Sequence, residues 1–344
     1  MSERPSSHDA APHVPAPDSG MRQPAALRSW LFVPGDSAHK QEKALATEAD
    51  AVILDLEDSV DPAHLPAARA LVCERVRSLP EGSSPQLWVR VNAPSGSLWR
   101  EDLAAVFGLL PRRSGGGGGE GLDRAPDGIV LPKVCAPGEI ASVAGHLVTL
   151  EARRGVSRGA TGLLVIATET ARGLLALPQY PAVLGASRAA MARLAGLTWG
   201  AEDLGAAVGA LGRHDAAGAL TFTFQLARTT CLLTAAALGV QAIDGVHVEL
   251  RDAHGLQRAL DEARRDGFSG KLAIHPGQVA AINAAFTPTA AEREHALRVV
   301  AAFAAARGAG VASLDGQMID RPHLIHARRV LAGAAEATRP KRGA

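Results

Sequence analysis

Residues 51–79 read AVILDLEDSVDPAHLPAARALVCERVRSL, and this stretch contains the unit from which the fold is built. Its first part, Ala51 to Leu56, is an apolar run that predicts a buried strand. An acidic cluster follows, and Pro62 to Leu79 then carries Ala, Leu and Arg at helical spacing. A strand that is apolar on both faces and leads into a helix is typical of a parallel sheet covered by helices.

The same unit recurs along the chain. Segments such as Glu139 to Arg154 and Leu220 to Leu238 have helical spacing and separate eight apolar runs, which are Trp30 to Val33, Ala51 to Leu56, Leu87 to Val91, Gly128 to Leu131, Leu163 to Ala167, Leu194 to Trp199, Gln241 to Val248 and Lys271 to Ile274. Eight strand–helix units in about 250 residues predict an α/β fold of the (β/α)8 TIM-barrel type. The alternative, an open doubly wound sheet, predicts a GxGxxG fingerprint after the first strand, and the chain there reads Val33-Pro-Gly-Asp36.

Composition excludes several classes of protein. The 344 residues include 36 Lys and Arg against 35 Asp and Glu, so no broad basic face for nucleic acid is expected. The chain contains no run of about 18 apolar residues, so no membrane span is predicted. The three cysteines lie far apart and form no CxxC pair, which favours a reducing compartment, and we expect a cytoplasmic protein.

The chain divides into one large unit with additions. Residues 1–26 are rich in Pro, Ser and Ala and lack a secretory signal, so we expect a disordered tail. Residues 27–286 form the predicted barrel, with a flexible glycine loop at 112–121 that lacks the Lys-Ser/Thr ending of a phosphate-binding P-loop. Residues 287–337 are predicted to form a C-terminal helical lid, and 338–344 a second tail.

Catalytic groups of such barrels lie at the carboxyl ends of the strands. In this chain most predicted strands end in charged or polar residues, namely Asp55-Leu56-Glu57-Asp58, Arg90-Val91-Asn92, Pro132-Lys133, Glu169-Thr170-Ala171-Arg172, Glu202-Asp203, Asp244 and His275-Pro276. Many acids therefore face a small basic set, Arg90, Lys133 and Arg172. This pattern predicts a functional site at that end of the barrel.

Glu169 and Asp203 follow neighbouring strands and form the best metal-binding pair. Two carboxylates without Cys or His suit Mg2+, which prefers oxygen ligands and keeps several waters. Arg90 could clamp a substrate carboxylate through two hydrogen bonds. A cation and an arginine together suit a 2-oxo acid, because the cation chelates its carboxylate and keto oxygens and polarises the carbonyl.

The remaining polar residues have more modest interpretations. Asp55 and Glu57 are expected to act indirectly, by orienting the arginine or a metal-bound water. Asp58 and Asp61 are expected to cap the helix that follows them. His275 is expected to be a hydrogen-bonded structural residue at a strand-to-helix turn. No HExxH spacing supports a zinc protease.

Seven segments carry a resemblance to a known family, and they are Arg28-Ser-Trp-Leu-Phe-Val-Pro-Gly35, Asp50-Ala-Val-Ile-Leu-Asp-Leu-Glu-Asp-Ser-Val60, Arg90-Val-Asn92, Leu131-Pro-Lys-Val134, Glu169-Thr-Ala-Arg-Gly173, Gly200-Ala-Glu-Asp-Leu204 and Gly267-Phe-Ser-Gly-Lys-Leu-Ala-Ile-His-Pro276. In this order, over about residues 27 to 330, the chain resembles the HpcH/HpaI aldolase–citrate lyase superfamily. Within it the chain is most similar to the CitE-like group with the malyl-CoA and citramalyl-CoA lyases.

The resemblance implies a (β/α)8 barrel with a C-terminal helical extension, assembled as a homotrimer or hexamer. It also implies that Mg2+ is held by Glu169 and Asp203 and that Arg90 binds the carboxylate of the oxo acid or hydroxyacyl group. The segment Gly316-Gln-Met-Ile-Asp-Arg-Pro-His-Leu-Ile-His-Ala327 is similar to the lid of the acyl-CoA lyases. There an Asp reaches the active site of a neighbouring subunit, which makes Asp320 a general acid/base at the acetyl-CoA methyl carbon. Asp320 also suits a cap of the final helix, and the two roles are compatible.

The implied reaction is reversible Claisen-type cleavage of a 3-hydroxyacyl-CoA of the malyl-CoA or citramalyl-CoA type to acetyl-CoA and a 2-oxo acid. Lys133 and Arg172 are candidates for stabilising the enolate. Alternatives are a malyl-CoA thioesterase, a citrate lyase β-subunit acting on a citryl thioester, and a metabolite-binding barrel without catalysis. The retained Glu169, Asp203 and Arg90, together with Asp320, argue against the last.

Overall fold

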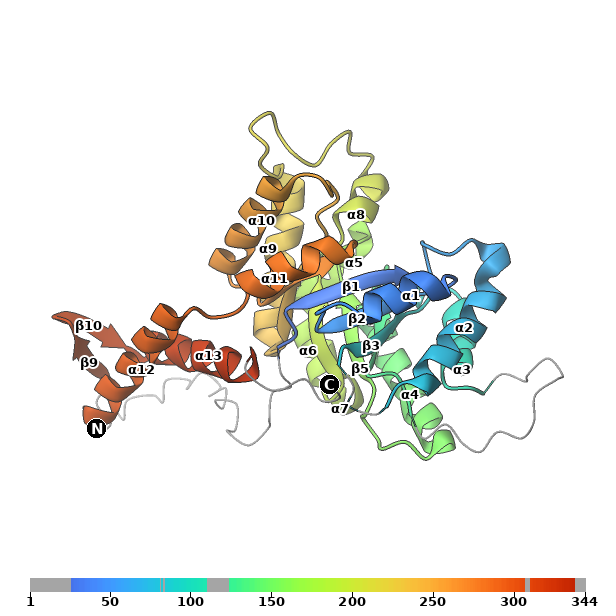
Figure 1. Cartoon of the computed structure of the whole chain (residues 1–344), viewed down its shortest axis with the longest axis horizontal. Coiled ribbons are helices and arrows are strands. Elements are labelled where there is room, and N and C mark those ends of the chain that lie inside the picture. Colours follow the sequence, from blue (N-terminus) through green and yellow to red (C-terminus); the bar gives the residue numbers. More distant parts are fainter. Residues whose placement is uncertain (1–25, 81, 83, 110–123, 307–309, 338–344) are drawn as a thin grey trace, which may run out of the picture.

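The computed structural model describes residues 26–80, 82, 84–109, 124–306 and 310–337. Eight parallel strands follow one another around a closed barrel, and β8 pairs back with β1. Figure 1 shows strands of the barrel with helices packed around them. Their bounds are β1 Ser29–Pro34, β2 Ala51–Asp55, β3 Gln86–Arg90, β4 Gly128–Leu131, β5 Gly162–Ile166, β6 Leu194–Thr198, β7 Gln241–Asp244 and β8 Gly270–Ala273. The predicted (β/α)8 barrel is confirmed. The expected tails at 1–26 (Ala26 apart) and 338–344 and the expected glycine loop at 112–121 lie outside the described residues.

Helices surround the barrel. They are α1 Ala38–Leu45, α2 Leu65–Ser78, α3 Leu98–Val106, α4 Pro137–Arg154, α5 Ala171–Ala176, α6 Tyr180–Gly185, α7 Arg188–Met191, α8 Ala201–Val208, α9 Phe222–Leu238, α10 Ala253–Asp266 and α11 Val279–Ala285, with 3-10 turns η1 Pro62–His64, η2 Leu177–Gln179 and η3 Pro276–Gln278. None of the helices in the described ranges has the length and apolar character needed to cross a membrane.

The strands are apolar on both faces, and each face packs into a separate core. One core fills the layer between sheet and helices, and the other fills the interior of the barrel. In the interior Trp30 and Trp88 meet edge to face with ring centroids 4.8 Å apart. The Trp88 indole occupies the space beside Gly128, where an added Cβ would lie 2.1 Å from a ring carbon. Glycine at position 128 therefore makes room for the indole that fills the barrel.

Two predicted elements differ from the structure. The seventh strand ends at Asp244 instead of Val248, since apolar character alone does not separate a strand from the half-buried loop that follows it. The C-terminal extension is not wholly helical: an antiparallel hairpin of β9 Val311–Leu314 and β10 Gln317–Asp320 separates α12 Ala290–Ala305 from α13 Arg321–Ala337. Its turn is Asp315-Gly316, whose φ angles of 51° and 79° suit the tight turn of a two-residue hairpin.

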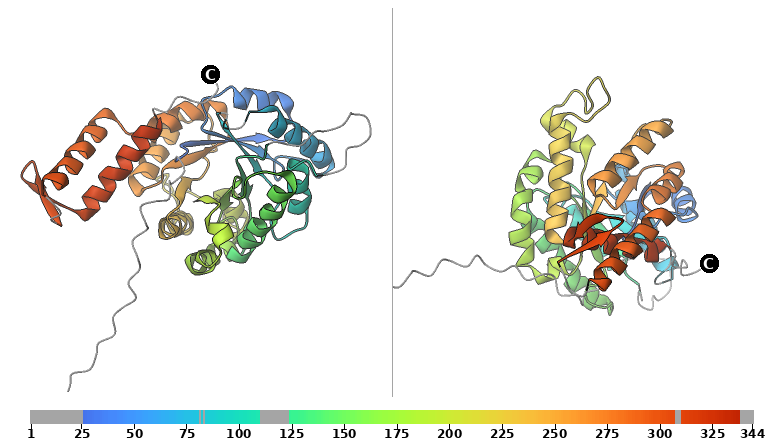
Figure 2. Two further views of the ribbon diagram at one scale, coloured as in Figure 1. Left: turned by 90° about the horizontal axis from the view of Figure 1, so that it is seen from below. Right: turned by 90° about the vertical axis from the view of Figure 1, so that its left-hand side faces the viewer.

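The extension projects from the barrel, with the hairpin at its outer end (Figures 1 and 2). It has a small apolar core of its own. It joins the barrel at the end where the strands begin: Arg28, just before β1, donates to Thr287 at 2.7 Å, and Arg264 pairs with Glu292 at 2.6 Å. A groove of about 1840 Å³ separates α12 and α13 from this amino-terminal end, and its floor includes Trp30 and Trp88.

The space beside the interior tryptophan gives a stability prediction. Replacing Gly128 with Ala should destabilise the protein by about 1–3 kcal/mol, because the new methyl group would overlap the Trp88 ring. Gly145 in the exposed middle of α4 is the matched control, since an added Cβ there meets nothing within 4 Å. Gly145→Ala should leave stability unchanged or raise it by up to about 1 kcal/mol. Urea unfolding of both variants measures the difference, and equal effects would contradict the packing assigned to Trp88.

Candidate functional site

Arg90 lies at the carboxyl end of β3 and is fixed by the strand beside it. Asp55, its register partner on β2, accepts two hydrogen bonds of 2.6 Å from the guanidinium Nε and Nη2. Burial disfavours the charged form of Asp55, but the hydrogen bonds and charge of Arg90 outweigh it and hold the pKa of this carboxyl below its usual value. Glu57 lies 3.0 Å from Nη1, and the Phe32 ring lies 5.0 Å below the guanidinium. Because guanidinium has five N–H donors, Arg90 keeps donors for an anionic substrate.

Lys133 follows β4 and contacts three acids. Its ammonium lies 2.7 Å from both carboxylate oxygens of Asp58, bonds to Glu57, and lies 3.4 Å from Asp203. Burial works against the charge of Lys133, but the hydrogen bonds that its ammonium donates to Asp58 and Glu57 raise its pKa above the usual value. The predicted capping role of Asp58 is therefore wrong, because its carboxylate pairs with this ammonium across the barrel end. Asp61 does cap η1, through a 2.8 Å hydrogen bond from the Ala63 N–H.

Glu169 lies just beyond β5 and is almost completely buried, with 4% of the residue exposed. Its Oε2 accepts a 2.5 Å hydrogen bond from the backbone N–H of Lys133. Burial raises the pKa of Glu169 to about 8, and the nearby negative charges of Asp203 and Glu57 act in the same direction. Gly200 leaves the space for this side chain, since an added Cβ would lie 2.5 Å from the Glu169 Cγ.

The site as a whole carries more negative than positive groups. Five carboxylates, from the ends of β2, β5 and β6, gather around two cations, Arg90 and Lys133; the carboxylates belong to Asp55, Glu57, Asp58, Glu169 and Asp203. Arg90 and Lys133 are each shared between several acids. Glu169 is the acid left with no cationic side chain in direct contact, so the burial that raises its pKa to about 8 is not offset by an ion pair.

Three residues from the predicted rim lie outside this cluster. Arg172 is exposed at the start of α5 and takes part in none of the ion pairs found for the described ranges. Asp244 faces the helices, where it is buried with Lys271 at 2.6 Å and Arg228 at 3.0 Å. His275 accepts a hydrogen bond from the Gly277 N–H at the start of η3, as expected for a structural residue.

Asp320 is also separate from the cluster of its own chain. It ends β10 at the outer part of the extension, which is attached to the opposite end of the barrel (Figure 1). Its carboxylate lies 2.6 Å from the His323 Nδ1, and both side chains are about half exposed. The contact is with the imidazole, whereas a helix cap would accept a backbone N–H bond.

A hydrogen-bond network that the sequence does not predict positions the end of β3. Asn92, two residues after Arg90, donates through Nδ2 to the Leu56 carbonyl at 3.0 Å and to Asp102 at 2.9 Å. Asp102 on α3 is fully buried and also pairs with Arg69 on α2. The network ties the strand end that carries Arg90 to the acidic segment after β2. No spacing in the sequence reveals it, because its members lie on separate elements.

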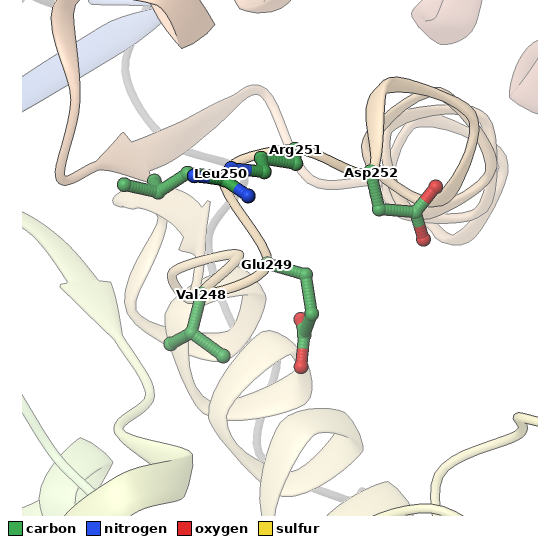
Figure 3. Close-up of a pocket in the computed structure, with 5 residues that line it drawn as sticks. All are labelled: Val248, Glu249, Leu250, Arg251 and Asp252. Atoms are coloured by element: carbon green, nitrogen blue, oxygen red, sulfur yellow. The ribbon is translucent and has the colours of Figure 1, made fainter.

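A shallow, open cavity of about 610 Å³ lies beside the loop between β7 and α10 at the same end of the barrel. Figure 3 shows the residues that line it, Val248, Glu249, Leu250, Arg251 and Asp252. The loop offers both apolar and charged side chains, and none of the clustered acids lines the cavity.

Comparison with known proteins agrees with this geometry. The model of the HpcH/HpaI aldolase/citrate lyase family matches residues 28–276, and a model described as a C–C bond lyase of the TIM-barrel fold matches residues 223–336. A citrate lyase subunit beta-like protein of Mycobacterium tuberculosis is 35% identical, over 91% of this chain and 98% of that protein. A (3S)-malyl-CoA thioesterase of Cereibacter sphaeroides is 33% identical, over 90% and 94% of the two chains. The mitochondrial citramalyl-CoA lyase of Rattus norvegicus is 31% identical, over 88% and 85%.

Solved structures give the same result. The crystal structure of CitE from Mycobacterium tuberculosis in complex with magnesium, acetoacetate and coenzyme A has a TM-score of 0.67 and 31% sequence identity, covering 91% of this chain and 100% of that one. Fold, strand-end residues and sequence similarity all point to one group of enzymes. The chain belongs to the HpcH/HpaI aldolase/citrate lyase family.

Proposed function

We propose that this protein is a Mg2+-dependent carbon–carbon lyase that cleaves a 3-hydroxyacyl-CoA of the malyl-CoA or citramalyl-CoA type to acetyl-CoA and a 2-oxo acid. One observation carries the proposal: the buried Glu169 carboxyl has no cationic side chain in direct contact among the described residues, and it lies within electrostatic reach of Asp203 and of Arg90, which has donors to spare. Relatives named citramalyl-CoA lyase and a CitE crystallised with magnesium and coenzyme A support this choice of substrate class and metal.

The donor set fits magnesium. Glu169 and Asp203 supply hard oxygen atoms, and the excess of carboxylates favours a divalent cation at this position. When bound, Mg2+ would supply Lewis-acid polarisation of the keto or hydroxyl oxygen of the substrate. Lys133 holds Glu169 through its backbone N–H, and Gly200 leaves the carboxylate room to face the site.

The residues of the chain then have defined tasks. Arg90, kept in place by Asp55, binds the carboxylate of the hydroxyacyl group. After cleavage this carboxylate belongs to the 2-oxo acid and remains bound to Arg90. Cleavage breaks the C–C bond, converts the C–OH group into the keto group with release of the hydroxyl proton to water, and leaves the electron pair of the broken bond on the methylene carbon of the acetyl thioester. Asp320 of another subunit returns a proton to that carbon, and removes it in the synthetic direction. The position of Asp320 on the extension, away from the cluster of its own chain, supports sites shared between subunits, and the homotrimer or hexamer implied by the family resemblance would supply them.

A thioesterase is the second candidate, because a (3S)-malyl-CoA thioesterase is 33% identical over most of both chains. Such an enzyme would release free CoA and malate without an oxo acid. A citrate lyase β-subunit would instead require a thioester on a partner protein.

The reaction can be identified with purified protein and MgCl2. Malyl-CoA and citramalyl-CoA are supplied separately, and acetyl-CoA, the oxo acid and free CoA are quantified. We expect equimolar acetyl-CoA and oxo acid, abolished by EDTA, and at least a 100-fold loss of kcat (order of magnitude) in Glu169→Gln and Asp203→Asn. Free CoA with no oxo acid would identify a thioesterase, and full activity of both variants would refute the metal site.

Shared active sites predict complementation between inactive subunits. Glu169→Gln and Asp320→Asn each remove one part of the site, and these parts come from different subunits. Mixed under conditions of subunit exchange, the two variants should form some sites with both native residues and regain activity. Each variant exchanged with itself is the control. A mixture that stays as inactive as its components would show that Asp320 does not act across subunits.

The proton on Glu169 gives a pH prediction for the metal-free protein. The pKa rises from the usual 4.5 to about 8 on folding, so the native state holds a proton that the unfolded state has lost between these values. This contribution to stability is complete below pH 4.5 and is lost as the pH rises through 8. In EDTA, the free energy of unfolding should therefore fall between pH 5 and 8 by more in the wild type than in Glu169→Gln. Parallel pH profiles in urea unfolding would contradict this.

A further inference from the structure

Lys133 contacts both proposed metal ligands, Glu169 through its backbone and Asp203 through its side chain. Its backbone N–H donates to the Glu169 Oε2 at 2.5 Å, and its ammonium lies 3.4 Å from the Asp203 Oδ1. Its φ angle of 52° lies in the left-handed region, which residues other than glycine seldom adopt. This conformation points the N–H at Glu169 while the side chain extends to the acids after β2.

The ammonium is held in this position by acids that are not proposed metal ligands. Asp58 binds it with both carboxylate oxygens at 2.7 Å, and Glu57 bonds to it as well. Glu57 is itself held by Arg90 at 3.0 Å. The positive charge is therefore tethered beside Asp203 and remains close even if its contact with that carboxylate breaks.

A cation fixed so close to a metal ligand has an electrostatic effect of known sign. A divalent cation bound at Asp203 must share the carboxylate with the ammonium or displace it, and the two positive charges repel each other in either case. Removing the ammonium also leaves Asp203 unneutralised in the metal-free protein. Both effects make a site without this charge bind a divalent cation more tightly.

We propose that Lys133 is an internal counter-cation of the metal site: its ammonium neutralises Asp203 while the site is free of metal and weakens the binding of a divalent cation there. The inference rests on the proposed function, because it takes Glu169 and Asp203 as the ligands. Lys133 is a positioning residue in this role, since it acts on the metal through Asp203. It keeps the acids together in the metal-free protein and keeps the cation exchangeable.

The test measures metal affinity, not turnover. Metal-free protein is titrated with Mn2+, and free Mn2+ is quantified by electron paramagnetic resonance. Lys133→Met removes the charge and keeps the length of the side chain, and we expect it to bind Mn2+ more tightly, on the order of tenfold. Lys133→Arg keeps the charge and should remain within about twofold of the wild type. Arg158→Met is the matched control, because it removes one positive charge from an exposed position at the opposite end of the barrel.

A second measurement separates this effect from general damage to the site. Mn2+ should raise the melting temperature of Lys133→Met by more than that of the wild type, because tighter binding to the native state stabilises it further. Lys133→Gln is a second neutral variant with the same expectation, and circular dichroism confirms that each variant is folded. A purely structural lysine would give the opposite result, since its loss would loosen Asp203 and weaken binding.

The outcomes distinguish the two proposals. Unchanged or weaker Mn2+ binding in the folded Lys133→Met and Lys133→Gln variants would overturn the inference and leave the metal site intact. Glu169→Gln serves as the reference for the site itself. If Glu169→Gln binds Mn2+ as tightly as the wild type, Glu169 is not a ligand, and both the metal site and the inference built on it fail. Tighter Mn2+ binding in Lys133→Met and Lys133→Gln would support the inference. Loss of that binding when Glu169→Gln is added to either variant would support the metal site as well.

Discussion

The excess of carboxylates at the carboxyl end of the barrel is the constraint on which the rest of the site depends. Charged groups that leave water need a partner, and here the acids outnumber Arg90 and Lys133. The structure responds in two ways. It shares each cation among several acids, and it leaves Glu169 protonated near neutral pH. A divalent cation would relieve the same imbalance. Metal binding and loss of the proton from Glu169 are therefore coupled.

The backbone makes this arrangement possible. Parallel register places Asp55 beside Arg90, so the ion pair forms directly between neighbouring strand ends. Lys133 adopts a left-handed conformation to reach Glu169, a strain that surrounding contacts must stabilise. Gly35 follows the same principle at the first strand, because an added Cβ would lie 2.4 Å from the Asp55 carbonyl oxygen. The site thus depends also on Gly35, which carries no functional group itself.

The barrel could be predicted from the sequence because each strand is an apolar run with a polar end, and every predicted strand is present. The residues that gather around Arg90 could be predicted for the same reason, since parallel strands bring their carboxyl ends together. Asp244 and Asp58 were misjudged, because a sequence does not show which side of a strand end faces the helices or which cation an acid will meet. The hairpin before Asp320 was missed even though Asp315-Gly316 is a turn signal, because the neighbouring segments are helical.

The interior tryptophan has a consequence for how this chain can vary over evolution. The Trp88 ring occupies the Cβ space of Gly128 on the next strand, and its far edge lies 3.0 Å from the Cβ position of Gly162 on the strand after that. A larger residue at either glycine is tolerated only if the indole has already become smaller. A smaller residue at position 88 leaves a void until the glycines gain volume. The three positions should therefore covary among relatives, although they lie far apart in the sequence and none contributes to the chemistry.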